Sequence, residues 1–300
     1  MLGYGREAID EATRLILAGL PVAIPTETVY GLAADAANGE AVARVYEAKG
    51  RPSFNPLIVH VSGVDQASEI AVFDAMARGL ADQYWPGPLT LVLPLRPDAP
   101  IAGLVIAGLK TIALRAPAHP AMRHLIAATG RPLAAPSANR SGRISPTRAE
   151  HVLAGLGGRI PLIVDGGPTA HGLESTIVAP AGGRMRLLRP GPIDLGLELE
   201  TASGIEAPGQ LRSHYAPQKP LRLEAVNADP EEWLIGFGSV AGDASLSASG
   251  NLVEAASRLF ELLHEAEAGE RPRIAVAPVP CAGLGAAIND RLRRAAAPRG

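Results

Sequence analysis

Cationic and small polar residues stand together in this sequence where an apolar run begins. The stretch KGRPSFNPLIVHV, residues 49–61, sets Lys49 and Arg51 beside one proline and Asn55 before another, and His60 falls in the apolar run that follows. Arginine meets a phosphate as a planar fork and lysine as a point charge. Because a proline biases the residue before it towards an extended backbone, this loop is suited to hold donors in place. We interpret it as part of an anion site, with a solvated basic turn as the alternative.

The same pattern, a polar side chain beside an apolar run, recurs along the first two thirds of the chain. It occurs in PTETVYGL (25–32), TIALRAP (111–117), PSANRSGRISPT (136–147), LESTIV (173–178) and LLRPGP (187–192). Arg115 in the second stretch must reach solvent, a partner carboxylate or a ligand, because an isolated charge is unfavourable among apolar residues. In the third stretch we expect Ser145 to cap a helix that starts at Pro146, next to small hydroxyls suited to an anion.

Taken alone, these residues predict a pocket for a phosphorylated or nucleotide ligand together with a small polar molecule. They do not name a reaction. The P-loop pattern G-x-x-x-x-G-K-[ST] is absent from the sequence, and we interpret GLG at 283–285 as a tight turn because Ile288 stands at the place of a third glycine. The spacing of the seven histidines and the single cysteine, Cys281, does not suggest a metal site built from side chains.

Composition and charge narrow the class of ligand. Aromatic residues make up 4% of the chain, which disfavours a platform for stacking single-stranded nucleic acid. The net charge is −2, but residues 44–189 carry 16 Lys and Arg against 9 Asp and Glu. A locally positive region suits a compact anion better than a long duplex. The N-terminal 24 residues fit neither a signal peptide nor a membrane span, so we expect a cytoplasmic protein.

Apolar runs and helical periods predict an α/β fold. Expected strands are 21–26, 56–61, 88–95, 111–117, 131–138, 161–167, 174–179 and 185–191, and expected helices are 6–18, 40–48, 64–84, 120–129 and 146–156. Several strands follow one another without a helix, which favours a mixed sheet over a regular doubly wound one. We expect a catalytic domain at 1–199, a linker at 200–220 and a small α/β domain at 221–300, where strand and helix patterns alternate.

In order and in kind, the polar stretches resemble the threonylcarbamoyl-AMP synthase family, also called YrdC-like. The K-x-R and S-x-N signatures of that family appear as Lys49-Gly50-Arg51 and Ser137-Ala138-Asn139, and WPGPLTLVL (85–93) matches as well. SHYAP (213–217) and the segment ending AINDRLRRAAAPR resemble the two-domain form of the family. The resemblance implies a twisted mixed-sheet YrdC-like domain, a linker that closes over the nucleotide and a small Rossmann-like C-terminal domain.

The resemblance further implies a reaction: L-threonine, bicarbonate and ATP condense to threonylcarbamoyl-AMP, and pyrophosphate is released. The product would serve threonylcarbamoyladenosine modification of tRNA by separate transfer proteins, with little or no stable tRNA binding by this chain and no membrane. Mg²⁺ would be coordinated mainly by the ATP phosphates. The alternatives are a non-catalytic RNA- or nucleotide-binding module of the same fold and a sugar-phosphate lyase, which would need an acidic metal site.

Carried over residue by residue, the resemblance assigns three sets of side chains. The signature residues expected in catalysis are Lys49, Arg51, Ser137 and Asn139. The expected ATP contacts are Arg51, Asn55, Thr111, Ser137, Ser145, Arg189 and Tyr215. The expected L-threonine contacts are Thr28, His60, Arg115, Ala135 and Ser175.

Overall fold

The computed structural model describes residues 1–200, 204, 206–210 and 213–298. Its larger sheet contains β1 (Leu2–Gly3), β2 (Val22–Pro25), β3 (Tyr30–Asp35), β4 (Ile58–His60), β5 (Leu89–Pro94), β6 (Thr111–Arg115), β7 (Leu133–Ala134), β8 (Leu162–Asp165), β9 (Thr176–Ala181) and β10 (Arg184–Arg189). Around this sheet lie α1 (Arg6–Leu17), α2 (Gly39–Lys49), α3 (Val64–Ile70), α4 (Ala75–Tyr84), α5 (Gly103–Ile106), α6 (Pro120–Thr129) and α7 (Ala149–Leu156). The second unit contains β11 (Leu221–Arg222), β12 (Glu232–Gly236), β13 (Ala244–Ser245), β14 (Arg273–Val276), α8 (Leu252–Ala268) and α9 (Leu284–Ala296).

The larger sheet is mixed, which confirms the expected fold class. Its strand order is β1-β8-β2-β3-β7-β4-β6-β5-β9-β10. β2 runs antiparallel to β3 and parallel to β8, and β4 runs parallel to β6. In the β4–β6 pair His60 is the register partner of Arg115, so both side chains belong to adjacent positions of one sheet face. The sheet therefore brings together two polar residues that lie 55 positions apart in the sequence.

Helix α2 positions the start of the basic loop. The Asn38 side chain accepts hydrogen bonds from the backbone N–H groups of Glu40 and Ala41, which begins the helix. Gly50 ends the helix with a left-handed backbone at φ 60°, a conformation that favours glycine. Because the helix stops there, Lys49 stays on its last turn and Arg51 enters the loop.

Two expected helices differ from those observed. The predicted helix 64–84 is two helices, α3 and α4, because the chain turns at 71–74 and the Asp74 side chain caps the second one. The helix expected to begin at Pro146 begins at Ala149, and its N-cap is Arg148. The prediction that Ser145 caps this helix is wrong, because its hydroxyl donates a hydrogen bond to the buried carboxylate of Glu174 instead. A charged acceptor outcompetes the helix end for that hydroxyl.

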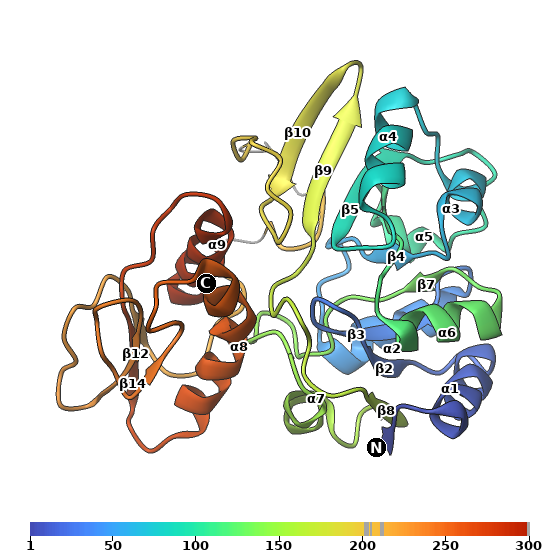
Figure 1. The fold of residues 1–300 in the computed structure, drawn as a ribbon. Helices are drawn as coiled ribbons and strands as arrows, with labels where there is room; N and C mark the ends of the chain where they lie inside the picture. The colour runs from blue at the N-terminus through green and yellow to red at the C-terminus, as the bar shows by residue number, and fades with distance from the viewer. Residues whose placement is uncertain (201–203, 205, 211–212, 299–300) are drawn as a thin grey trace.

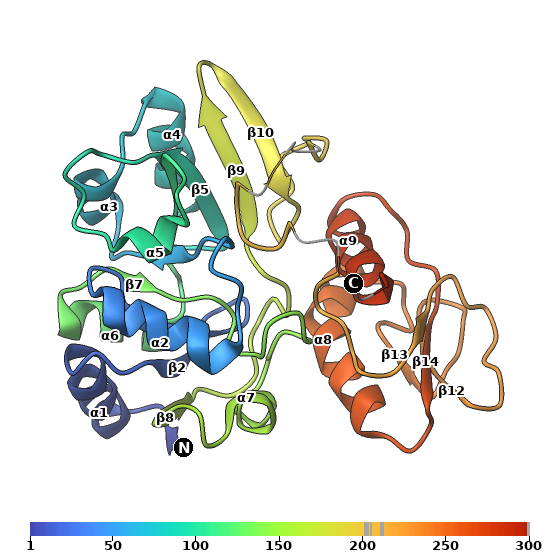
Figure 2. The same cartoon turned by 180° about the vertical axis from the view of Figure 1, so that it is seen from behind.

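The second unit is a parallel sheet of order β11-β14-β12-β13. Helices α8 and α9 lie between this sheet and the first unit in both views (Figures 1 and 2). One buried cluster joins Val29, Ile144, Leu173 and Tyr215 to residues of α8 and α9 such as Phe260. The two units thus share an apolar core at their contact.

Of the expected linker 200–220, residues 201–203, 205 and 211–212 lie outside the described residues. Within the described part of the chain, the structure has no helix long and apolar enough to cross a membrane.

Candidate functional site

A narrow cavity, partly open to solvent, lies where the larger sheet meets residues 208–209 and 214–215. The residues that line it are Thr26, Thr28, Val29, Gly31, Arg51, Ile58, His60, Arg115, Ala135, Pro136, Ser137, Glu174, Ser175, Arg189, Pro208, Gly209, His214 and Tyr215. All five residues expected to contact L-threonine are among them.

Arg115 is buried and held from three sides. Its Nη2 donates to Glu27 Oε1 at 2.6 Å, its Nη1 to Thr28 Oγ1 at 2.9 Å, and its Nε to the carbonyl of Gly87 at 3.2 Å. Burial raises the pKa of Glu27, but the charge and hydrogen bond of Arg115 outweigh it and lower that pKa to about 2. The partner carboxylate expected as one alternative for Arg115 is therefore present, and the guanidinium still reaches the cavity wall.

His60 is buried beside Arg115, and its Nδ1 has no hydrogen-bond partner. Burial, reinforced by the charge of Arg115, lowers the pKa of His60 to about 3. The imidazole is therefore neutral at pH 7. A buried polar atom without a partner is rare in a folded protein and points to an absent ligand or water.

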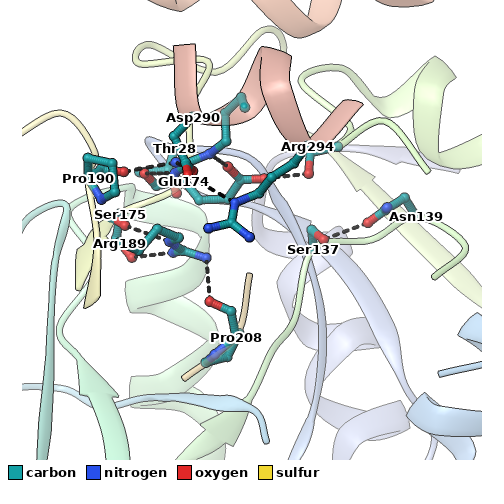
Figure 3. Close-up of polar contacts among 12 residues, drawn as sticks. Thr28, Ser137, Asn139, Glu174, Ser175, Arg189, Pro190, Pro208, Asp290 and Arg294 are labelled. Atoms are coloured by element: carbon teal, nitrogen blue, oxygen red, sulfur yellow. Dashed lines mark hydrogen bonds and ion pairs between the residues drawn. The ribbon is translucent and has the colours of Figure 1, made fainter. Parts of the chain in front are cut away.

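On the other side of the cavity, Arg189 is held by the strand that follows Glu174. Its Nε donates to the Ser175 carbonyl at 3.1 Å, its Nη2 to Ser175 Oγ at 3.1 Å and its Nη1 to the Pro208 carbonyl at 3.3 Å (Figure 3). Ser175 Oγ also pairs with Thr90 Oγ1 at 2.7 Å. These bonds fix the guanidinium between Ser175, which directly precedes β9, and Pro208.

Two of the four signature residues line the cavity, and the other two hold the loop that carries Ser137. Ser137 and Arg51 line the cavity. Lys49 lies behind them, and its Nζ donates to the carbonyls of Ser137 at 2.6 Å and Asn139 at 2.5 Å. Burial, together with the charge of Arg51, lowers the pKa of Lys49. Asn139 Oδ1 accepts from Ser137 Oγ at 2.5 Å (Figure 3), so Lys49 and Asn139 set the shape of this loop.

Arg51 also shapes its own loop. Its Nε donates to the carbonyl of Asn55 at 3.2 Å and its Nη2 to the carbonyl of Pro56 at 2.8 Å. Asn55 is 1% exposed, and neither its amide nitrogen nor its amide oxygen has a hydrogen-bond partner. An unsatisfied buried amide next to a guanidinium is a second indication of a ligand position.

Five of the expected site residues are outside the cavity wall: Lys49, Asn55, Thr111, Asn139 and Ser145. Thr111 begins β6, four residues before Arg115. Ser145 is fully buried, with its hydroxyl bonded to Glu174. The cavity brings the other nine together.

The expected sets lacked Glu174, His214 and the linker residues Pro208 and Gly209, all of which line the cavity. Glu174 precedes Ser175 in LESTIV, and a carboxylate at the start of a buried strand is a signal that it pairs with a cation. Neither Pro208 nor Gly209 carries a comparable signal, because a polar linker has no periodicity from which to place it.

The fold and the cavity define a two-unit α/β protein with a pocket lined by three arginines. Two family models match the chain. Sua5_yciO_yrdC, described as "Telomere recombination", matches residues 14–191, and Sua5_C, described as "Threonylcarbamoyl-AMP synthase, C-terminal domain", matches residues 193–297. The chain belongs to the Sua5/YciO/YrdC family, in its two-domain Sua5 form.

Similar proteins extend over nearly the whole chain. A threonylcarbamoyl-AMP synthase of Bacillus subtilis is 40% identical over 97% of this chain and 93% of its own length. One of Pyrococcus abyssi is 38% identical over 97% of this chain and 96% of its own length. The crystal structure of P. abyssi Sua5 complexed with L-threonine superposes with a TM-score of 0.90 at 36% identity, covering 98% of this chain and 96% of that one. These matches confirm the resemblance drawn from the sequence motifs.

Proposed function

We propose that this protein is a threonylcarbamoyl-AMP synthase, which condenses L-threonine, bicarbonate and ATP to threonylcarbamoyl-AMP and releases pyrophosphate. The observation that carries the proposal is that three arginines, Arg51, Arg115 and Arg189, line one cavity. An amino-acid carboxylate and a triphosphate are two anions that must be held together, and fixed positive charge offsets their repulsion. The names of the relatives and the L-threonine bound to P. abyssi Sua5 support the same assignment.

The L-threonine half of the site is Thr28, His60, Arg115, Ala135 and Ser175. The bonds of Arg115 to Glu27, Thr28 and Gly87 use three of its five N–H groups. The remaining hydrogens on Nη1 and Nη2 are available to pair with the substrate carboxylate. The neutral His60 would take a polar group of threonine at its unpartnered Nδ1.

The ATP half comprises Arg51, Asn55, Thr111, Ser137, Ser145, Arg189 and Tyr215, with Lys49 and Asn139 supporting the loop that carries Ser137. The unpartnered amide of Asn55 favours a direct ligand contact. Because Ser145 is bonded to Glu174 and absent from the wall, we assign it to supporting that carboxylate beside the nucleotide.

The chemistry needs positioning more than a covalent nucleophile. Bicarbonate and the threonine amine condense to a carbamate and release water. A carbamate oxygen then attacks the α-phosphorus of ATP, and the bond from that phosphorus to the oxygen that bridges to the β-phosphate breaks, which releases pyrophosphate. Holding the two anions in line removes most of the entropic barrier. Of the signature residues, Arg51 and Ser137 would orient the triphosphate, and Lys49 and Asn139 would hold the loop that carries Ser137. Arg51 would also stabilise charge that develops on the departing pyrophosphate.

The pocket residues do not form a Mg²⁺ site of their own. Glu174, the carboxylate on the wall, is paired with Arg291, and nearby Glu27 is paired with Arg115. In the described residues, no group of three or more His, Cys, Asp or Glu is arranged to hold a metal ion. Mg²⁺ would therefore arrive as part of the substrate MgATP.

The wider assignments follow from this reaction. We assign residues 1–199 to the catalytic domain, 200–220 to a linker that closes over the nucleotide and 221–300 to a Rossmann-like domain. Tyr215 supports this role for the linker, because it is 1% exposed and lines the cavity. The product would pass in the cytoplasm to separate proteins that transfer threonylcarbamoyl to tRNA.

The test is product identification with labelled carbon. Purified protein is incubated with MgATP, L-threonine and ¹³C-bicarbonate. The nucleotides are then separated by chromatography, and their masses are measured by mass spectrometry. Threonylcarbamoyl-AMP should carry one added mass unit relative to the unlabelled reaction. Nucleotide binding without this product would instead favour the non-catalytic alternative.

A further inference from the structure

A buried arginine of the second unit contacts residues that line the cavity. Arg291 lies on α9, and its side chain is 0% exposed. Its Nε donates to Glu174 Oε2 at 2.9 Å, and its Nη1 donates to the carbonyl of Pro190 at 2.9 Å. Glu174 is on the cavity wall, and Pro190 follows Arg189, which is on the wall as well. One side chain of α9 therefore contacts two segments that build the pocket.

Glu174 depends on this partner. Its Oε1 accepts from Ser145 Oγ and its Oε2 from Arg291 Nε, so both carboxylate oxygens are used (Figure 3 labels Glu174 beside α9). Burial raises the pKa of Glu174, but the charges of Arg291 and then Arg189 outweigh it and lower that pKa. The carboxylate is therefore ionised. Without Arg291 this buried carboxylate would lose its ion-pair partner and would repel the phosphates of a nucleotide more strongly.

Tyr215 is a second side chain that Arg291 contacts. The Arg291 guanidinium carbon lies 5.3 Å from the centre of the Tyr215 ring. Tyr215 has a left-handed backbone at φ 63°, which is unfavourable for a residue with a Cβ and persists when surrounding contacts hold it. Stacking on a buried guanidinium is one such contact.

The arginine itself is held by its own helix. Arg291 Nη1 also donates to Asp290 Oδ2 at 2.9 Å, and Arg294 Nε donates to Asp290 Oδ1 at 3.0 Å. Contacts within α9 therefore hold the guanidinium in the orientation in which it contacts Glu174 and Tyr215. This fixed geometry is what a positioning residue requires.

We propose that Arg291 is a positioning residue that completes the nucleotide side of the cavity by holding the Glu174 carboxylate and the Tyr215 ring in place. The role rests on the proposed function, because the ligand concerned is its substrate ATP. It gives the second unit a part in the reaction: docking of α9 sets the geometry of the wall, although none of the residues of α9 lines the cavity in the described structure.

The test measures nucleotide affinity separately from turnover. Binding of α,β-methylene-ATP, which cannot be cleaved at the bond broken in the reaction, is measured by calorimetry well below the melting temperature of each variant. Arg291→Met should weaken binding by about tenfold or more, because it removes the ion-pair partner of the buried Glu174 carboxylate. Arg291→Lys keeps the charge but loses the planar guanidinium group. Its affinity for the analogue should therefore lie between that of wild type and that of Arg291→Met. The double variant Glu174→Gln/Arg291→Met should recover most of the loss.

Arg293→Met is the matched control, since Arg293 lies on the same helix and is exposed. It should bind the analogue within about twofold of wild type, inside the scatter of a surface change. Affinity of Arg291→Met within about twofold of wild type, or no recovery in the double variant, would overturn the proposal even if the melting temperature falls. If Arg291→Met does not fold, Arg291→Lys is used in its place, and an affinity of that variant within about twofold of wild type overturns the proposal. If the wild-type protein binds the analogue but forms no product, the proposed reaction is contradicted. The comparison of analogue affinity between wild type and the Arg291 variants remains valid in that case.

Discussion

Replacing Glu27 by glutamine tests whether its ion pair with Arg115 is the buried anchor of the amino-acid site. The pair joins Arg115 Nη2 to Glu27 Oε1 at 2.6 Å, with side chains 4% and 9% exposed. The pKa of Glu27 is lowered from 4.5 to about 2. At about 1.4 kcal/mol per pKa unit, the carboxylate contributes about 3 kcal/mol to the free energy of unfolding at pH 7. Breaking a buried pair generally costs a similar amount.

The expected result is a fall in melting temperature of roughly 6–12 °C at pH 7, from the usual scaling for domains of this size. Because folding lowers the pKa of Glu27, its contribution is complete above about pH 4.5 and is lost as the pH falls through about 2. The free-energy difference between wild type and variant should therefore shrink to about 2 kcal/mol at pH 3.5. Differential scanning calorimetry across this pH range measures both quantities.

Glu11→Gln is the matched control, since Glu11 and Arg14 form an ion pair of the same 2.6 Å length on an exposed helix face. Its removal should barely change the melting temperature, because surface pairs contribute little. The reasoning is refuted if Glu27→Gln melts no lower than Glu11→Gln, or if the deficit of Glu27→Gln at pH 3.5 equals that at pH 7.

Two further substitutions test other parts of the account. Arg51→Ala should reduce pyrophosphate-forming turnover by at least about a hundredfold with an unchanged circular dichroism spectrum, from loss of charge at the leaving group; a large loss of thermal stability would instead assign Arg51 to holding its loop. Burial, with the charge of His151, lowers the pKa of His264 to about 3, so the unfolded chain takes up the proton first as the pH falls below 6.5. His264→Gln should therefore lose about 2 kcal/mol less stability than wild type between pH 7 and pH 5, and equal losses would refute this assignment.

Local sequence patterns were sufficient for much of the sheet, and the family resemblance added residues such as Ala135 and Tyr215 on the wall of the cavity. Predicted strands at 56–61 and 111–117 became β4 and β6, and the register of those strands placed His60 beside Arg115. Apolar runs reveal such strands because burial on both faces demands them. β3 was missed, since YGLAAD follows a polar turn without an alternating pattern.

Contacts between distant charges were beyond prediction from the sequence. Ser145 followed the pattern of a helix cap but bonds Glu174, a partner 29 residues away. Arg291 carries a signal that was not used: it lies four residues from both Ala287 and Ala295, on the apolar face of α9. A charged residue on that face must find a buried partner, but the sequence does not say that the partner is Glu174 in the other unit.

The central claim is tested most directly by measuring pyrophosphate release from ATP while each substrate is omitted in turn. The protein is dialysed free of bicarbonate, assayed in sealed, carbon-dioxide-free buffer, and compared with and without L-threonine. The account predicts pyrophosphate only when L-threonine and bicarbonate are both present, because the nucleophile that attacks the α-phosphorus is the carbamate they form. Pyrophosphate release at the same rate without L-threonine, or none in the complete mixture, would contradict it.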